Sequence, residues 1–155
     1  MPNGTYSQIY IHVVFAVKGR ASMIKSSWEN KLFKYINGII TKKNQKLLAI
    51  NGVSDHIHIL ISISPSCRIS DLVREIKKST NKYINSSFFP NNIFSWQEGY
   101  GVFSHSNSAI ENVRAYINNQ KEHHRKASFR DEYIKLLKDF AVEYKEEYLF
   151  DWNED

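Results

Sequence analysis

Four stretches of the chain have the pattern of β-strands. In the first and third, apolar and polar residues alternate with a period of two, which places one set of side chains on each face of a sheet. The second is a short apolar run, and the fourth follows a loop that contains a proline and two glycines. The predicted strands are residues 8–17, 46–52, 55–64 and the segment around 100–103.

Four other stretches repeat their apolar residues at the spacing of an amphipathic α-helix. The predicted helices are residues 26–43, 68–84, 108–124 and 128–140. The first six elements therefore follow the order β-α-β-β-α-β, which is the order of the ferredoxin-like split βαβ fold. We expect an α+β sandwich in which an antiparallel sheet carries two helices on one face, with an additional helix later in the chain.

The strand at residues 55–64, DHIHILISIS, has two different faces. Isoleucines at alternate positions form one face, and we expect the first two helices to cover it. His56 and His58 begin the other face, about 7 Å apart at ~3.3 Å per residue, which is close enough to share one ion or one phosphate. This face is left for the third helix or a partner, so we expect both imidazoles to lie on the open side of the sheet.

The composition is that of a single globular domain. Hydrophobic residues make up 42% of the 155 residues, and no repeat or linker divides them. We expect one domain over residues 1–155, with a core at about 5–125 and a C-terminal helix and acidic tail at 126–155. Cys67 is the single cysteine, no run approaches the ~18 apolar residues of a membrane span, and the first residues lack signal-peptide features. These features predict a cytoplasmic protein with no membrane partner.

The charge is distributed unevenly along the chain. Residues 1–120 hold 14 Lys and Arg against 6 Asp and Glu, whereas residues 121–155 hold 7 against 10. A basic body with an acidic C-terminal region favours a polyanionic partner for the body, with nucleic acid as the leading candidate.

A tyrosine and a glutamine stand one turn apart in the predicted helix 108–124. On a helical wheel, Tyr116 and Gln120 lie side by side on the flank of the apolar stripe. Each pattern has an ordinary structural explanation when it stands alone. A flanking tyrosine usually packs against its neighbours, and two histidines at a strand start are usually only partly exposed side chains.

Taken together, these residues resemble a known family, the single-tyrosine HUH transposases of small bacterial insertion sequences. The resemblance rests on HVVFAVKGR, DHIHILISI, WQEGYGVFSHS and VRAYINNQKEHH, and it extends to the C-terminal SFRDEYIKLLKDFAVEYKEEYLF. It implies that His56, His58 and Gln120 hold a divalent metal, Mg²⁺ or Mn²⁺, and that Tyr116 is the nucleophile. We see no departure from the family pattern at these four positions.

The resemblance also implies a reaction and its partners. A transposase of this family cleaves and rejoins single-stranded DNA through a 5′-phosphotyrosine, acts on hairpins at the ends of the element, and works as a homodimer at the nucleoid. The tyrosine helix of one subunit can complete the metal site of the other. We therefore expect a two-fold dimer in which His56 and His58 of one chain meet Tyr116 and Gln120 of its partner.

Further side chains are candidates for contacts with DNA. Aromatic rings stack on bases, and basic residues follow the phosphate backbone. The aromatic candidates are Tyr6, Tyr10, Phe94, Trp96 and Tyr100, and the basic ones are Lys18, Arg20, Arg74, Lys77, Lys78 and Lys82.

The other histidines have weaker roles. We expect His12 to share the sheet face of His56 and His58, and His105 to lie in a surface loop. His123 and His124 are expected to favour the end of their helix electrostatically.

Two alternatives stay open at this point. One is a ferredoxin-like nucleic-acid-binding module, which would match the fold and the charge. The other is an HUH nuclease adopted by the host, without transposition. A histidine-triad hydrolase is disfavoured because Leu60 stands where its third histidine would be, and a two-histidine phosphoesterase lacks its second motif.

Overall fold

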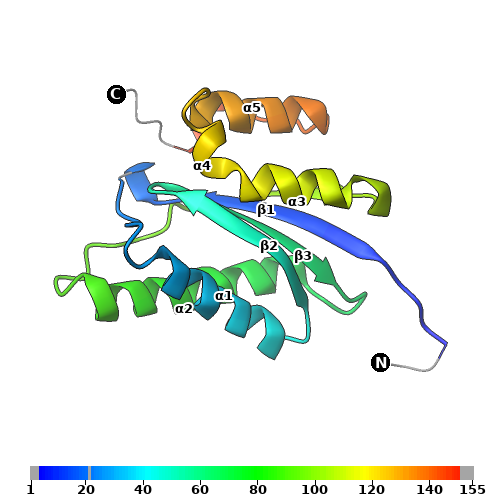
Figure 1. Cartoon of the computed structure of the whole chain (residues 1–155), viewed down its shortest axis with the longest axis horizontal. Coiled ribbons are helices and arrows are strands. Elements are labelled where there is room, and N and C mark those ends of the chain that lie inside the picture. The colour runs from blue at the N-terminus through cyan, green and yellow to red at the C-terminus, as the bar shows by residue number, and fades with distance from the viewer. Residues whose placement is uncertain (1–3, 21, 151–155) are drawn as a thin grey trace.

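The four strands form one antiparallel sheet in the order β2-β3-β1-β4, as expected for a split βαβ fold. Strands β1, β2 and β3 are labelled in Figure 1. This computed structural model describes residues 4–20 and 22–150. The strands are β1 (Ile9–Ala16), β2 (Lys46–Val53), β3 (His56–Ile63) and β4 (Gly101–His105). Strand β3 pairs with both β1 and β2, so the histidine strand lies inside the sheet and not at its edge.

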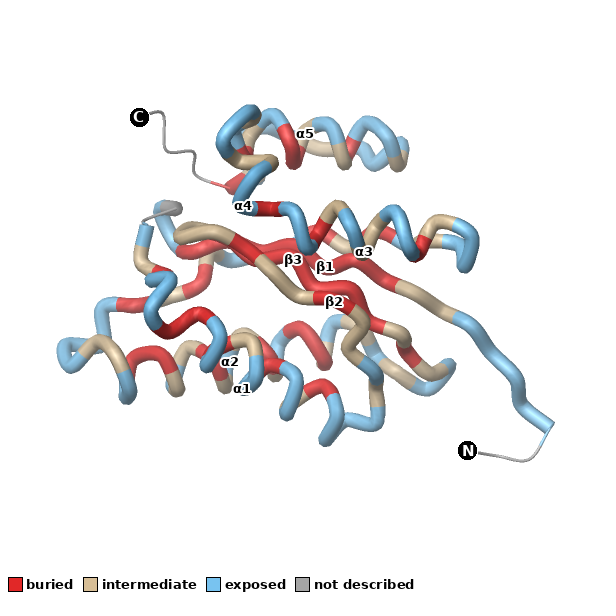
Figure 2. The backbone as a smooth tube through the Cα atoms, viewed as in Figure 1, coloured by how far each residue is buried: buried red, intermediate tan, exposed pale blue. Residues whose placement is uncertain are grey.

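Helices α1 (Glu29–Lys42) and α2 (Ile69–Phe88) cover one face of the sheet (Figure 1). The isoleucines of β3 pack against the apolar stripes of these two helices and form the main core. Figure 2 shows the buried segments on the sides of both helices that face the strands. The prediction for the isoleucine face is therefore confirmed.

The opposite face of the sheet is covered as well. The third predicted helix lies on it, which is one of the two expected alternatives, whereas the expectation that the imidazoles lie on an open side is wrong. Helices α3 (Ile110–Asn118), α4 (Gln120–His123) and α5 (Phe129–Asp139) lie over it (Figure 1). Leu60 of β3 gives this face an apolar contact for Ile110 and Ile117 of α3. The third helix is therefore packed on the sheet of its own chain.

Helix α5 is anchored by a second apolar cluster. Phe129 and Tyr133 pack with Val14 of β1 and Phe103 of β4. The backbone of β4 comes very close to this helix at Gly101, where an added Cβ atom would lie 2.7 Å from the Tyr133 hydroxyl. Gly101 thus sets the spacing between the sheet and α5.

The predicted helix 108–124 is divided in two. Its backbone leaves helical geometry at Asn119, with φ −100° and ψ 17°, and the Asn119 N–H donates to the carbonyls of Ala115 and Tyr116. The first helix starts at Glu29, three residues later than predicted, and α2 runs to Phe88. In the part of the chain that the structure describes, no helix has the length and apolarity needed to cross a bilayer.

Candidate active site

The two histidines of β3 lie at the centre of the site. His56 and His58 are both fully buried, because α4 and α5 cover the face that the sequence left open. The expectation that they face open space is wrong, whereas the expectation that His12 shares their face is confirmed. The strand register sets this arrangement. Val14 of β1 pairs with His58, and His12 precedes Val14 by two residues, so its side chain lies on the same face of the sheet.

Each histidine is held through its Nδ1 atom. His56 Nδ1 lies 2.8 Å from Oδ1 of Asp55, and His58 Nδ1 lies 2.8 Å from Nε2 of His12. Both Nε2 atoms are left to meet other partners. Ligand histidines in metalloproteins are commonly held in this way, with the second ring nitrogen on a carboxylate or another polar group.

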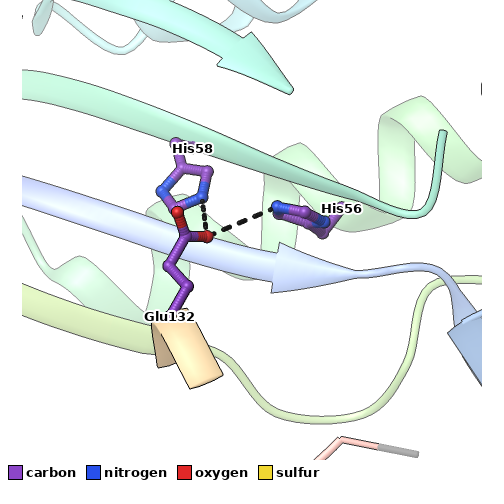
Figure 3. A group of neighbouring side chains, drawn as sticks. All are labelled: His56, His58 and Glu132. Carbon is purple, nitrogen blue, oxygen red and sulfur yellow. Dashed lines mark hydrogen bonds and ion pairs between the residues drawn. The ribbon is translucent and has the colours of Figure 1, made fainter. Parts of the chain in front are cut away.

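A carboxylate from α5 completes the group, and the sequence analysis missed it. Oε1 of Glu132 lies 3.0 Å from His58 Nε2 and 3.6 Å from His56 Nε2 (Figure 3). One ligand atom from each of these three buried residues lies within 4.8 Å of the others. Neighbouring ligands of an octahedral ion at about 2.1 Å are about 3.0 Å apart, so these spacings suit three ligands around one ion.

Tyr116 and Gln120 reach the same carboxylate despite the break at Asn119. The Tyr116 hydroxyl donates a short hydrogen bond to Oε2 of Glu132, and Nε2 of Gln120 donates to the same oxygen at 3.2 Å. Gln120 is fully buried and Tyr116 is half-buried. The four residues predicted for the site are thus brought together around Glu132.

His123 and His124 also point at Glu132. Their Nε2 atoms lie 3.2 Å and 3.4 Å from its two oxygens. The expectation that they act on the end of their helix does not describe these contacts. They instead surround the carboxylate with further groups that can donate hydrogen bonds.

Two buried atoms of the group lack a hydrogen-bond partner among the described residues. They are Nε2 of His56 and Oε1 of Gln120. A buried polar atom without a hydrogen-bond partner is costly, and a bound water, ion or ligand can satisfy it. Both atoms belong to predicted metal ligands, so the residues present fit a bound cation.

Burial and charge together shift the pKa values of the group. Burial lowers the pKa of His58 to about 4, although Glu132 favours its charged form. Burial also opposes the charge on His56, but its interactions with the carboxylates of Asp55 and Glu132 raise its pKa above the ordinary value. Burial acts against the Glu132 anion, yet the histidines that donate to it lower its pKa. Burial and the charge of Glu132 raise the pKa of Tyr116, so its proton is held firmly in this state.

A cavity of about 520 Å³ opens beside the site, between α3 and α5. Tyr116, Glu132 and His12 line it together with Val113 and Leu136. His105 also lines it, from strand β4 and not from a loop as expected. The cavity therefore lies against the tyrosine and its carboxylate partner.

Some of the DNA-contact candidates gather in a second hollow, and others do not. Arg74, Lys77 and Lys78 of α2 line a groove of about 650 Å³ with Tyr100, which is 37% exposed. Tyr6 is 93% exposed, whereas Phe94 is buried in the core, so the stacking expected of Phe94 is wrong. Trp96 is also largely buried, but it lines this groove. Side chains of the remaining candidates lie outside this groove, and that of Arg20 lies outside the described residues.

The site forms within one chain. The rings of His58 and Tyr116 are 5.8 Å apart, and Gln120 reaches Glu132 without a second subunit. The contact of α3 with Leu60 holds the tyrosine helix on the sheet of its own chain. The expected composite site, in which the tyrosine and the histidines belong to different chains of a dimer, stays a prediction.

Comparison with known proteins identifies relatives of this chain. Residues 5–120 match the family described as transposase IS200 like. The ISDra2 transposase TnpA of Deinococcus radiodurans is 20% identical over 126 residues, covering 77% of this chain and 89% of that protein. The family match stops at Gln120, so α5 with Glu132 lies beyond it.

Two solved structures have the same fold. A candidate transposase from Deinococcus radiodurans R1 superposes with a TM-score of 0.63 at 23% identity, over 77% of this chain and 96% of the other. A REP-associated tyrosine transposase bound to a REP hairpin superposes with a TM-score of 0.61 at 15% identity, over 100% of this chain and 93% of the other.

Proposed function

This chain belongs to the IS200-like transposase family, and from that premise we propose that Tyr116 is the nucleophile that cleaves and rejoins single-stranded DNA. Its hydroxyl oxygen attacks phosphorus, the bond to the 3′ oxygen breaks, and a 5′-phosphotyrosine remains. The covalent link keeps the energy of the phosphodiester bond, so a 3′-hydroxyl can later reverse the step on a new strand. The place of Tyr116 in the lining of the α3–α5 cavity, with its hydroxyl on Glu132, supports this role.

Glu132 is placed to take the proton of the nucleophile. The Tyr116 hydroxyl already donates to its Oε2 atom. The proton stays on the tyrosine in the resting protein, because the neighbouring anion disfavours a phenolate. As the oxygen bonds to phosphorus its basicity falls, and transfer to the carboxylate becomes favourable.

A divalent metal is proposed beside the nucleophile, and the two partnerless buried atoms, His56 Nε2 and Gln120 Oε1, are the observation that carries it. His58 and Glu132 complete the ligand set. A bound divalent ion polarises the scissile phosphate and stabilises the charge that develops on it. Glu132 adds one anionic oxygen to neutral ligands, and such a mixed set suits Mn²⁺ or Mg²⁺.

The nucleophile is tested by trapping the covalent product. A labelled hairpin oligonucleotide with a single-stranded flank should give a shifted band on a denaturing gel. Tyr116→Phe should abolish this band and retain DNA binding, because the ring and its packing remain. Tyr10→Phe is the matched control, since Tyr10 is a half-buried tyrosine on the same face of the sheet. An undiminished adduct with Tyr116→Phe would move the nucleophile elsewhere.

The metal site is tested without DNA. Calorimetric titration with Mn²⁺ should show one site in the wild-type protein, and His56→Ala should remove it. His105→Ala serves as the control, because His105 lies near the site but outside the group around Glu132. Equal Mn²⁺ binding by wild type and His56→Ala would refute the ligand assignment.

We also propose a surface for the DNA partner and an oligomeric state. We assign the groove of Arg74, Lys77, Lys78 and Tyr100 to the backbone and bases of a DNA strand from the element end, on the basis of its charge and its exposed ring. A homodimer is also proposed, in which each chain keeps its own complete site.

Mixing two inactive proteins tests whether each chain of that dimer keeps its own complete site. One carries Tyr116→Phe and the other carries His56→Ala with His58→Ala. Sites built within one chain should give no recovery after subunit exchange, because every chain keeps its own defect. Recovery of the adduct would support the composite site instead.

A further inference from the structure

We propose that His12 is a positioning residue for metal binding, which donates to His58 Nδ1 without the ion and accepts a hydrogen bond from it when the ion binds, so that the Nε2 lone pair of His58 becomes free for the ion. The inference rests on the proposed metal site, because it explains how one ligand of that site is prepared. The comparisons and the sequence motifs give His12 no such task.

The contact between the two rings is short and fully enclosed. His12 Nε2 lies 2.8 Å from His58 Nδ1, and the ring centroids are 5.0 Å apart in a stacked arrangement. His12 is 1% exposed and His58 is fully buried. A buried imidazole nitrogen needs a partner, so each ring determines which nitrogen of the other carries hydrogen.

The neighbours of His58 determine which of its ring nitrogens carries the proton when no metal is bound. Glu132 is approached by the hydroxyl of Tyr116, the amide of Gln120 and the imidazoles, and it accepts from them as a carboxylate. His58 must therefore carry its proton on Nε2 to donate to Glu132. Its Nδ1 atom is then an acceptor, and His12 donates from Nε2.

Metal binding requires the opposite arrangement. The ion takes the lone pair of His58 Nε2, so the proton of this neutral ring must sit on Nδ1. That proton is donated to His12 Nε2, which becomes the acceptor while the His12 proton moves to its own Nδ1. Both rings carry one proton before and after the change, so the pair switches tautomer without gaining or losing charge.

Only a group that can both donate and accept supports both states. Asp55 on His56 is different, because a carboxylate accepts in every state and holds the Nδ1 proton of His56 in place. His12 keeps one hydrogen bond to His58 whether or not the ion is present. The two histidines therefore differ. The ring proton of His56 stays on Nδ1 in both states, whereas that of His58 moves to Nδ1 only when the ion binds.

The test compares two substitutions by Mn²⁺ titration. His12→Phe keeps a ring but removes the partner of His58 Nδ1, and we expect the affinity to fall on the order of 10–100-fold, the usual effect of losing such a partner. His12→Gln restores a group that donates and accepts near the position of Nε2, and we expect most of the affinity to return. Circular dichroism and a melting curve confirm that each variant is folded.

A second measurement needs no variant. Long-range ¹H–¹⁵N spectra of histidine-labelled protein should show His58 with its proton on Nε2 without metal and on Nδ1 with saturating Mg²⁺, and His12 should change from Nε2 to Nδ1.

The outcomes separate this inference from the metal site itself. Wild-type Mn²⁺ affinity in a folded His12→Phe protein, or a His58 tautomer that does not change, overturns the role of His12 and leaves the metal site standing. Mn²⁺ binding that is insensitive to His56→Ala overturns both.

Discussion

The two faces of the sheet are built from different chemistry. Against α1 and α2, strand β3 presents only isoleucines, which pack into one apolar core. Against α3, α4 and α5, the same strand presents His56, His58 and Leu60, and the apolar contacts surround a buried polar group. A buried polar group costs solvation free energy unless all its atoms find partners, and here two do not among the described residues. We infer that the isoleucine face mainly stabilises the fold and that the histidine face holds the reacting groups.

The helices on the two faces also differ in charge. Helices α1 and α2 together hold 7 Lys and Arg against 3 Asp and Glu, whereas α3, α4 and α5 hold 5 against 5. The excess positive charge thus lies on the face away from the tyrosine. We propose that this division lets the protein hold DNA on the α1–α2 side of the sheet and react with it on the side of Tyr116.

The isoleucine face should dominate stability. Ile59→Ala removes a fully buried side chain, and we expect a loss of about 2–5 kcal/mol in the free energy of unfolding. Mn²⁺ affinity per folded molecule should be unchanged, because Ile59 lies across the sheet from the site. Urea denaturation and calorimetry measure the two effects, and a loss of Mn²⁺ affinity would show that the faces are not independent.

The histidine face should make stability depend on pH. Burial lowers the pKa of His58 to about 4 and holds that of His12 well below its usual range. The unfolded chain takes up protons at these residues near pH 6.5 and the folded chain does not, so stability falls as pH drops from about 6.5 toward 4.

The loss attributable to His58 is about 3 kcal/mol in total. The raised pKa of His56 acts in the opposite sense, because its contribution is present at low pH and is lost as pH rises through the folded value. Urea unfolding of metal-free protein between pH 8 and 5 measures the net effect. Ile59→Ala should lower the free energy of unfolding by the same amount at every pH. A wild-type free energy of unfolding that does not change with pH would contradict the lowered pKa values of His58 and His12.

Removing the charge of Glu132 should affect the chemistry more than the fold. Glu132→Gln keeps the shape of the side chain but replaces an anionic ligand with a neutral one, so we expect Mn²⁺ affinity to fall on the order of 10–100-fold. Asp131→Asn, at the exposed neighbouring position of α5, is the matched control. Full Mn²⁺ affinity in Glu132→Gln would remove this residue from the ligand set.

The basic groove should give the smallest effect. Arg74→Ala with Lys78→Ala is expected to weaken binding of single-stranded DNA and to reduce the salt slope of log K by roughly 1.4, at roughly 0.7 per phosphate contact. Fluorescence anisotropy at several salt concentrations measures this slope. Lys138→Ala, on the face without excess charge, should leave it unchanged, and equal slopes in all variants would remove the groove from the DNA path.

Much of the fold could be predicted from local pattern. Strict alternation fixed which residues of β3 face α1 and α2, and the element order gave the sheet topology. The break at Asn119 could not be predicted, because helical periodicity continues through it. Likewise, Phe94 and Trp96 carry no local sign that separates a core ring from a base-stacking ring.

The candidate site was predicted except for its centre. His56, His58, Tyr116 and Gln120 follow from a family motif, but Glu132 stands in a different helix, and the family match ends before it. One signal was present in the sequence. Glu132 adjoins Tyr133 and follows Phe129 by three residues, so it lies beside the buried stripe of its helix and not on the solvent side.

Gly101 gives the site an unusual vulnerability. This residue is not one of the predicted site residues, yet an added Cβ atom there would lie 2.7 Å from the Tyr133 hydroxyl, so any side chain would displace the ring that anchors the helix of Glu132. In a mutational screen for transposition it should therefore score like a reacting residue, although its role is purely one of spacing. The geometry of the candidate site therefore depends on the absence of a Cβ atom at position 101.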